Sequence, residues 1–360
     1  MTRHVWDPIC LPPDGLVRPV RIDPAGVDGP TRGQAHGPRW RRTSYGFFVP
    51  VDVPDVPEQR ILEQSIRLPA GGAVTGWASC RMLRASFFDG LEADGRTLIP
   101  VPLAVGVLGN PRPDRAVTIL RERLESEEVV VLHGVPCTRD RRALFDEMRR
   151  VVDVREAVVA MDMMAAAERV SIARMRAYAE AHARWRRVRQ VRAALDLADE
   201  RSRSPNETRM RLIWQIDAGF VRPLVNQPVW DRAGNLLGIA DLLDPVAGVV
   251  GEFDGADHRS ALRHSKDVDR EARFRGHQLE LFRVTGPDIP QRSRVVQRMA
   301  SARSRAKWLP EADRPWTIVP PSGWPIDPTL DEALDDRDAR WALYAQWEQD
   351  GTAVADRVRS

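Results

Sequence analysis

The pattern of hydrophobic and polar positions changes near Arg203, and from there it predicts an α/β fold. Leu212, Ile216 and Phe220 follow one another at intervals of four, which is the spacing of one helix face. Residues 249–253 form a short apolar run that is typical of a strand buried on both faces. The predicted elements are helix 204–220, strands 223–230, 236–243 and 249–253, helix 258–274, strand 278–284 and helix 290–308.

The remaining pattern predicts an N-terminal region before this α-β-β-β-α-β core and a C-terminal arm after it. Residues 1–57 are rich in Pro and Gly, and short strand-like segments continue to residue 132, so this part is α+β. We expect three parts, namely residues 1–200 with a small β-rich and a helical part, the core at 201–309, and a Pro-rich arm with a last amphipathic helix at 310–360. The helices expected in the N-terminal region are 57–68, 136–150, 154–168 and 171–200.

The composition is that of an ordinary globular protein. The chain has 360 residues, of which 43% are hydrophobic and 29% charged, so about two domains are expected and global disorder is excluded. No run of about 18 apolar residues is present, and residues 1–13 contain no apolar segment, so we expect neither a membrane span nor a signal peptide. The three cysteines are far apart in the sequence, which argues against a disulfide framework or a zinc site and predicts a cytoplasmic protein.

Nearly all positive charge comes from arginine. The formal net charge is only +3, and lysine occurs only at Lys266 and Lys307. Arg binds phosphate groups in a bidentate manner, although a GC-rich genome would produce the same bias. Within the predicted helix 171–200, Arg186, Arg189 and Arg192 are spaced by three and form the nearest one-sided set. They are the candidate DNA-binding residues, and a solvated helix face is the alternative.

Acidic residues converge at the end of an apolar hairpin. Its turn centres near Val246, and opposed residues of an antiparallel pair have a constant index sum, so Asp241 should lie opposite Gly251 or Glu252. Glu252 and Asp254 are two residues apart and share one face of their strand. Two like charges 4 Å apart repel by about 4 kcal/mol at an effective dielectric of 20. Positive charge is therefore expected near these carboxylates.

A divalent cation would supply that charge. Mg²⁺ and Mn²⁺ take carboxylate oxygens together with water and phosphate oxygens, which makes Asp241 and Glu252 the candidate metal ligands and Asp254 a candidate catalytic neighbour. A metal held there can activate water and neutralise the charge that develops on a phosphodiester under attack. The alternative is that the carboxylates pair at the sheet rim with arginines, for which the candidates are Arg209, Arg270 and Arg273.

Glu207 has a purely local interpretation. Ser204, Pro205 and Glu207 match a capping box, with Ser204 as the N-cap and Pro205 at the first helical position. Spacing alone therefore predicts a helix cap at Glu207.

Four segments between residues 203 and 288 carry a family resemblance. They are SPNETR at 204–209, GIAD at 238–241, VVGEFDG at 249–255 and the returning strand LELFRVT at 279–285, which follows a charged helix. This combination resembles the PD-(D/E)XK nuclease superfamily, and more closely a domain of unknown function related to very-short-patch-repair endonucleases.

The resemblance implies roles for individual residues. Glu207 would be the acid of the first helix, Asp241 the metal-binding aspartate and Glu252 the second acid. The superfamily lysine is replaced by Asp254, which leaves His258 to orient the attacking water as an auxiliary base. The alternative for His258 is a solvent-exposed histidine at the start of a helix.

Residues 29–200 are similar to AbiEi-type antitoxins of type IV toxin–antitoxin systems. The matching segments are WRRTSYGFFV at 40–49, VTGWAS at 74–79 and GVPCTRDRRALFD at 134–146. The resemblance implies a nucleotidyltransferase toxin as partner. Residues 1–40 are too rich in Pro and Gly to supply the helices of that family's winged helix-turn-helix.

Together these observations predict a DNA endonuclease that depends on Mg²⁺ or Mn²⁺ and acts in DNA repair or in defence against foreign DNA. Its expected partner is DNA, and no membrane partner is expected. The alternative function is a non-catalytic antitoxin or transcriptional regulator whose nuclease fold is degenerate.

Overall fold

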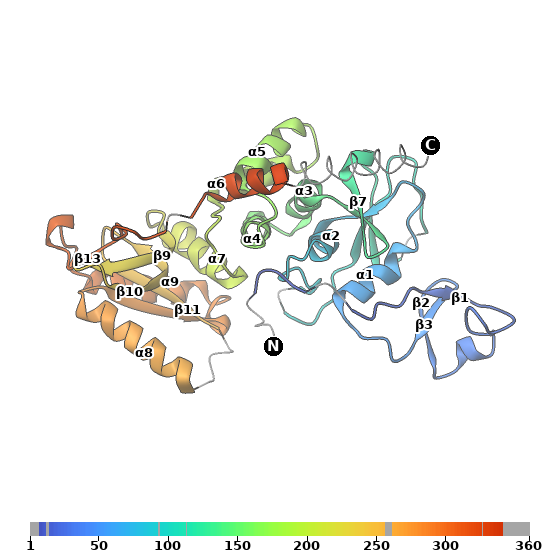
Figure 1. Ribbon diagram of the computed structural model, residues 1–360, viewed down its shortest axis with the longest axis horizontal. Helices are drawn as coiled ribbons and strands as arrows, with labels where there is room; N and C mark the ends of the chain where they lie inside the picture. Colours follow the sequence, from blue (N-terminus) through green and yellow to red (C-terminus); the bar gives the residue numbers. More distant parts are fainter. Residues whose placement is uncertain are drawn as a thin grey trace, which may run out of the picture. The chain divides into compact units, whose positions relative to one another are not determined.

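The computed structural model describes residues 7–11, 14–92, 94–112, 114–255, 261–325 and 327–340. The chain is a mixed α/β protein that forms two compact units, and Figure 1 labels many of their helices and strands. Unit 1 contains the chain up to Arg169 together with Met175–Asp196, and unit 2 contains Val170–Arg174 and the chain from Leu197 onward. No helix in these described ranges is long and apolar enough to cross a membrane.

The described residues of unit 1 form two sheets. In the smaller one, β3 (Phe47–Pro50) pairs with antiparallel neighbours on both sides, and Val49 is fully buried. The larger sheet is mixed, with the order β6-β5-β4-β8-β7. The other strands are β1 (Val20–Arg21), β2 (Trp40–Ser44), β4 (Ala73–Val74), β5 (Val101–Ala104), β6 (Val117–Leu120), β7 (Val129–Leu132) and β8 (Val135–Thr138).

The helices of unit 1 follow local signals in the sequence. Pro57 occupies the first turn of its helix, and the Asp153 side chain accepts a hydrogen bond from the Glu156 backbone N–H at 3.0 Å as an N-cap. The third helix buries Leu144 and Phe145 completely. The helices are α1 (Pro57–Ser65), α2 (Gly76–Met82), α3 (Asp140–Arg150), α4 (Val154–Ala166), α5 (Ile172–Ala181) and α6 (Val188–Leu197).

Two helix predictions in this region are wrong in extent. The helix expected at 136–150 starts only at Asp140, because the preceding residues form β8, which pairs with β4 and β7. The helix expected at 171–200 is interrupted between α5 and α6, where Arg187 has a φ of 62°. Trp185, in this interruption, packs against Phe145 with ring centroids 5.8 Å apart. The expected helix is thus interrupted where Trp185 packs on α3, and the sequence pattern did not indicate this interruption.

Unit 2 is built on a mixed sheet with the order β12-β11-β10-β9-β13. β11 and β12 are parallel, and the other neighbours are antiparallel. The elements are α7 (Pro205–Leu212), the π-helical segment η3 (Ile213–Asp217), β9 (Leu224–Asp231), β10 (Leu236–Asp244), β11 (Val249–Asp254), α8 (Ala261–Gly276), β12 (Glu280–Thr285), α9 (Arg292–Arg305) and β13 (Trp316–Thr317).

Alternating strand residues of unit 2 supply two separate cores. Val249 of β11 packs with Trp214 of η3 and Val295 of α9, whereas its neighbour Val250 packs with Phe274 of α8. The sheet is therefore covered on both faces, as the apolar run at 249–253 indicated. The expected order of helix, three strands, helix, strand and helix is present, although the helix expected at 204–220 ends as α7 at Leu212 and continues as η3.

The Pro-rich arm contributes to this sheet. Trp316 of β13 lies opposite Asp231 of β9 and is only 3% exposed. Residues 330–340 are helical, in the region where the last helix was expected. The sequence pattern did not indicate β13, because a two-residue strand has no periodicity of its own.

Candidate functional site

The β10–β11 hairpin positions two of the predicted site residues. Leu242 lies opposite Gly251 and Leu243 opposite Val250, and the paired residues end there. Asp241 and Glu252 are the next residues on the two strands, and the charge of Glu252 acts on Asp241. The turn is held by Asp244, whose Oδ1 accepts hydrogen bonds from the backbone N–H groups of the two residues after Pro245 at 3.0 and 3.1 Å. Of the two partners that the turn position left open for Asp241, Gly251 is paired with Leu242, so the structure favours Glu252.

Asp241 is held by the neighbouring strand and surrounded by negative charge. Its Oδ2 accepts a hydrogen bond from the Phe253 backbone N–H at 2.7 Å. Burial raises the pKa of Asp241 well above its ordinary value, and the charges of Glu252 and Glu207 raise it further, against the lowering effects of the Phe253 hydrogen bond and of Arg270. Three carboxylates that are distant in sequence thus influence one another electrostatically.

Glu252 is buried and paired with an arginine. It is 5% exposed and forms an ion pair with Arg270 of α8. A glycine on β10 permits this approach, because a Cβ atom at Gly238 would lie 2.9 Å from Arg270 Cγ and 2.8 Å from Phe274 Cζ. The alternative that the carboxylates pair with nearby arginines is therefore correct for Glu252 and Arg270.

Ser204 is the predicted N-cap, whereas the Glu207 side chain accepts from the backbone N–H of Arg203 instead of that of Ser204, so the predicted capping box is only half formed. Ser204 Oγ accepts a hydrogen bond from the Glu207 backbone N–H at 3.2 Å and donates one to Glu207 Oε1 at 3.0 Å. Glu207 Oε2 accepts hydrogen bonds from the Arg203 backbone N–H at 3.0 Å and from Asn226 Nδ2 at 2.9 Å. Glu207 is therefore a helix cap that is also tied to strand β9.

Asn226 is a site residue that the sequence analysis missed. It is 5% exposed, and its Nδ2 also donates to the backbone carbonyl of Arg201 at 2.8 Å. Its φ of 44° lies in the left-handed region, which Asn tolerates better than most residues do. No local pattern singled it out, because its partner Glu207 lies on a different element.

The donor set suits a hard cation in chemistry but is incomplete on its own. Asp241 and Glu252 offer carboxylate oxygens, which Mg²⁺ and Mn²⁺ prefer. Across the described residues, no group of three or more His, Cys, Asp or Glu side chains is arranged to hold a metal ion. A cation bound here would therefore need water or substrate oxygens in addition to the two carboxylates, which is usual for Mg²⁺.

Of the two remaining predicted site residues, the structure describes only Asp254. Asp254 is half-exposed at the end of β11, opposite Thr285 of β12. His258 lies outside the described residues. Whether His258 approaches Asp241 stays a prediction.

The three candidate DNA-binding arginines do not share one helix. Arg189 and Arg192 are exposed on α6, but Arg186 lies in the interruption between α5 and α6. The one-sided set is therefore reduced to two residues, because the helix on which the spacing argument depended ends before Arg186.

Comparisons of this chain with protein-family models, with curated proteins and with solved structures gave no match.

Proposed function

We propose that the chain is a metal-dependent phosphodiester hydrolase that acts on DNA. The observation that carries this proposal is the hairpin on which Asp241 lies beside Glu252, with the charge of Glu207 acting on Asp241 from the first helix of the same unit. Burial and the charges of the two neighbouring carboxylates raise the pKa of Asp241. A carboxylate in such surroundings is unfavourable without a compensating function, and such groups are frequent at active sites.

The order of elements in unit 2 supports the same function. Three antiparallel strands are followed by a helix and a strand parallel to β11, with α7 and α9 packed on one face and α8 on the other. This is the α-β-β-β-α-β arrangement expected from the resemblance to PD-(D/E)XK nucleases. In that scheme Glu207, Asp241 and Glu252 occupy the three acidic positions.

Asp241 and Glu252 would hold the cation, and Glu207 would help to position it. The cation would polarise the phosphodiester and neutralise the charge that develops there. The Phe253 backbone N–H fixes Asp241 Oδ2, and Arg270 fixes Glu252. Each carboxylate is thereby oriented by a neighbouring element, which is the arrangement that precise ligation requires.

The direct experiment is incubation of the pure protein with plasmid, nicked, mismatched and single-stranded DNA, with Mg²⁺, with Mn²⁺ and with EDTA. We expect cleavage of at least one substrate that depends on the metal and is abolished by EDTA. Cleavage that continues unchanged in EDTA would contradict the assignment of Asp241 and Glu252 as ligands.

The ion pair between Glu252 and Arg270 favours a second candidate function. A carboxylate already paired with Arg needs no metal, and Asp254 stands where the nuclease superfamily has lysine. An AbiEi-like antitoxin or regulator with a degenerate nuclease fold would bind DNA or a nucleotidyltransferase toxin without cleaving DNA. DNA binding that is insensitive to metal, with no cleavage of any of the four substrates, would favour this second function.

Glu207→Gln separates the capping role from the catalytic role. Gln can accept the same hydrogen bonds from Arg203 and Asn226, so we expect the free energy of unfolding to change by less than about 1 kcal/mol. Gln is a poor ligand for a hard cation, so DNA cleavage should fall at least about tenfold. Urea unfolding and plasmid cleavage measure the two effects.

The matched control for this change is Ser204→Ala, which removes the N-cap oxygen and keeps the carboxylate. It should lower stability by about 1 kcal/mol and leave cleavage per folded molecule unchanged. If Glu207→Gln also leaves cleavage unchanged, Glu207 is only a cap.

Replacing Arg189 and Arg192 by Gln tests the reduced arginine set on α6. If both contact phosphates, the slope of log K for DNA binding against log salt should become less steep by about two units, since each phosphate contact contributes about 0.9. Filter binding over a salt series measures this slope. An unchanged slope would mean that the exposed face of α6 is merely solvated.

A further inference from the structure

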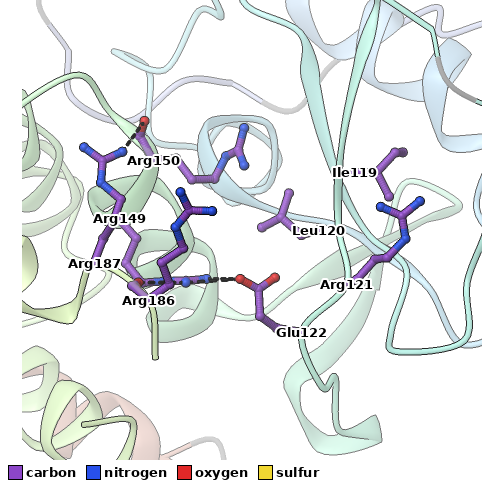
Figure 2. Close-up of a pocket in the computed structure, with 8 residues that line it drawn as sticks. All are labelled: Ile119, Leu120, Arg121, Glu122, Arg149, Arg150, Arg186 and Arg187. Atoms are coloured by element: carbon purple, nitrogen blue, oxygen red, sulfur yellow. Dashed lines mark hydrogen bonds and ion pairs between the residues drawn. The ribbon is translucent and has the colours of Figure 1, made fainter. Parts of the chain in front are cut away.

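A pocket in unit 1 is lined mainly by arginines. Its volume is about 450 Å³, and its residues come from β6 and the segment after it, from the end of α3 and from the interruption between α5 and α6. Figure 2 shows guanidinium groups on both sides of Leu120 and Glu122. The lining residues are Ile119, Leu120, Arg121, Glu122, Arg149, Arg150, Arg186 and Arg187.

Two of the arginines build the wall of this pocket. Arg149 donates hydrogen bonds to Glu122 Oε1 at 3.2 Å and to the Arg186 carbonyl at 3.1 Å, which joins the three segments. Arg187 donates to the carbonyls of Arg150 and Val151 at 3.4 and 3.2 Å, where α3 ends. These contacts satisfy carbonyls at the helix terminus and neutralise the glutamate.

Two other arginines carry positive charge that no contact in the pocket wall neutralises. Within the described ranges, the guanidinium groups of Arg150 and Arg186 form no hydrogen bond or ion pair with the protein, and Arg121 reaches only Asn110 Oδ1 at 3.3 Å. Burial lowers the pKa of Arg150, against the raising effect of nearby carboxylates led by Glu147. These three side chains are exposed, and a guanidinium group without a fixed acceptor is free to donate to an anion that enters beside it.

We propose that this pocket binds the phosphate groups of a nucleotide. Arg121, Arg150 and Arg186 would donate to the phosphate oxygens in the bidentate manner that favours Arg over Lys, and Ile119 and Leu120 offer an apolar surface for the base or sugar. A volume of about 450 Å³ is in the range of small-molecule sites. The inference rests on unit 1 alone and does not depend on the proposed nuclease site of unit 2.

Phosphate of this kind could come from a free nucleotide or from the 5′ end of a DNA strand. Calorimetric titration of the full chain with ATP, with pyrophosphate, and with a single-stranded oligonucleotide with or without a 5′-phosphate distinguishes these sources. We expect ATP to bind with a Kd in the micromolar range. Stronger binding of the phosphorylated than of the unphosphorylated oligonucleotide, without binding of ATP, would identify a strand end instead and overturn the free-nucleotide assignment.

Two matched pairs of variants locate the site. Arg186→Glu reverses a charge in the interruption between α5 and α6, and Arg184→Glu does the same in the same segment outside the pocket. Arg150→Gln and Arg141→Gln form the corresponding pair on α3. We expect at least tenfold weaker ATP binding for each pocket variant and less than a twofold change for each control.

The replaced guanidinium groups hold no other element in place, so all four variants should melt within a few degrees of the wild type. Equal weakening by a pocket variant and its control would reduce the effect to general electrostatic attraction and would overturn the proposal. Absence of binding of ATP, pyrophosphate and both oligonucleotides to the wild type would overturn it as well.

Discussion

Asp241→Asn should abolish metal-dependent cleavage of DNA, with a loss of at least about a hundredfold, and should make the protein insensitive to added metal. Asn keeps an oxygen that can accept the hydrogen bond from the Phe253 backbone N–H, so the local strand geometry is retained. It removes the negative charge that a hard cation requires. The measurement is plasmid cleavage in Mn²⁺, together with thermal melting at increasing Mn²⁺ concentration.

In the absence of metal, Asp241→Asn should raise the stability of the protein, although it removes the stabilisation that metal gives. In the wild type the Asp241 charge is buried and repelled by Glu252 and Glu207. The neutral Asn relieves this repulsion, so the metal-free variant should melt at a higher temperature than the metal-free wild type. Binding of metal to the native state alone stabilises it by about 2.7 kcal/mol at a hundredfold excess over Kd, and only the wild type should gain this.

A control for Asp241→Asn is Asp231→Asn at the far end of β9. Asp231 Oδ1 accepts hydrogen bonds from the backbone N–H groups of Ala233 and Asn235, a role that Asn can also perform. This variant should cleave DNA and respond to Mn²⁺ as the wild type does. An equal rise in melting temperature with Mn²⁺ in Asp241→Asn and in the wild type would remove Asp241 from the site.

Glu147→Gln should stabilise the protein at alkaline pH, by about 3 kcal/mol at pH 8. Glu147 is buried on α3, and its Oε2 accepts a hydrogen bond from the Trp77 backbone N–H at 2.8 Å. Burial raises the pKa of Glu147 from its ordinary value of 4.5 to about 7. Each unit of difference between the folded and unfolded pKa corresponds to about 1.4 kcal/mol.

The direction of this pH dependence follows from the protonation of Glu147 in the folded and in the unfolded chain. Below pH 4.5 the carboxyl is protonated in both states, and the stability contribution is fully present. Between pH 4.5 and about 7 the unfolded chain loses the proton first, so stability falls as the pH rises. Gln stays neutral and can keep the hydrogen bond from Trp77, so the variant lacks this loss.

Urea unfolding of both proteins from pH 4.5 to pH 8 tests this expectation. The two free energies should be similar at the acidic end and should diverge toward pH 8. Glu180→Gln on the exposed side of α5 is the control and should change stability by less than about 0.5 kcal/mol at any pH. A constant difference between Glu147→Gln and the wild type across this range would contradict the raised pKa.

The sequence by itself determined the features that depend on neighbouring residues. Ser204 and Pro205 start α7 as the capping pattern indicates, because the cap is completed within four residues. The turn at Asp244 sets the register of β10 and β11, since a hairpin fixes which residues oppose one another once its turn is placed. The turn position therefore narrowed the residue opposite Asp241 to Gly251 or Glu252, and the structure favours Glu252.

Only the tertiary structure decided the contacts between distant elements. The choice of Arg270 as the partner of Glu252 depends on how α8 packs over Gly238, and the tie between Glu207 and Asn226 depends on how α7 packs against β9. Arg186 lines the pocket because the predicted helix is interrupted at this point. Next to Arg186 in the interruption, Trp185 packs against Phe145 of α3. Periodicity reports the faces of an element along its own axis, whereas these contacts depend on which faces of different elements meet.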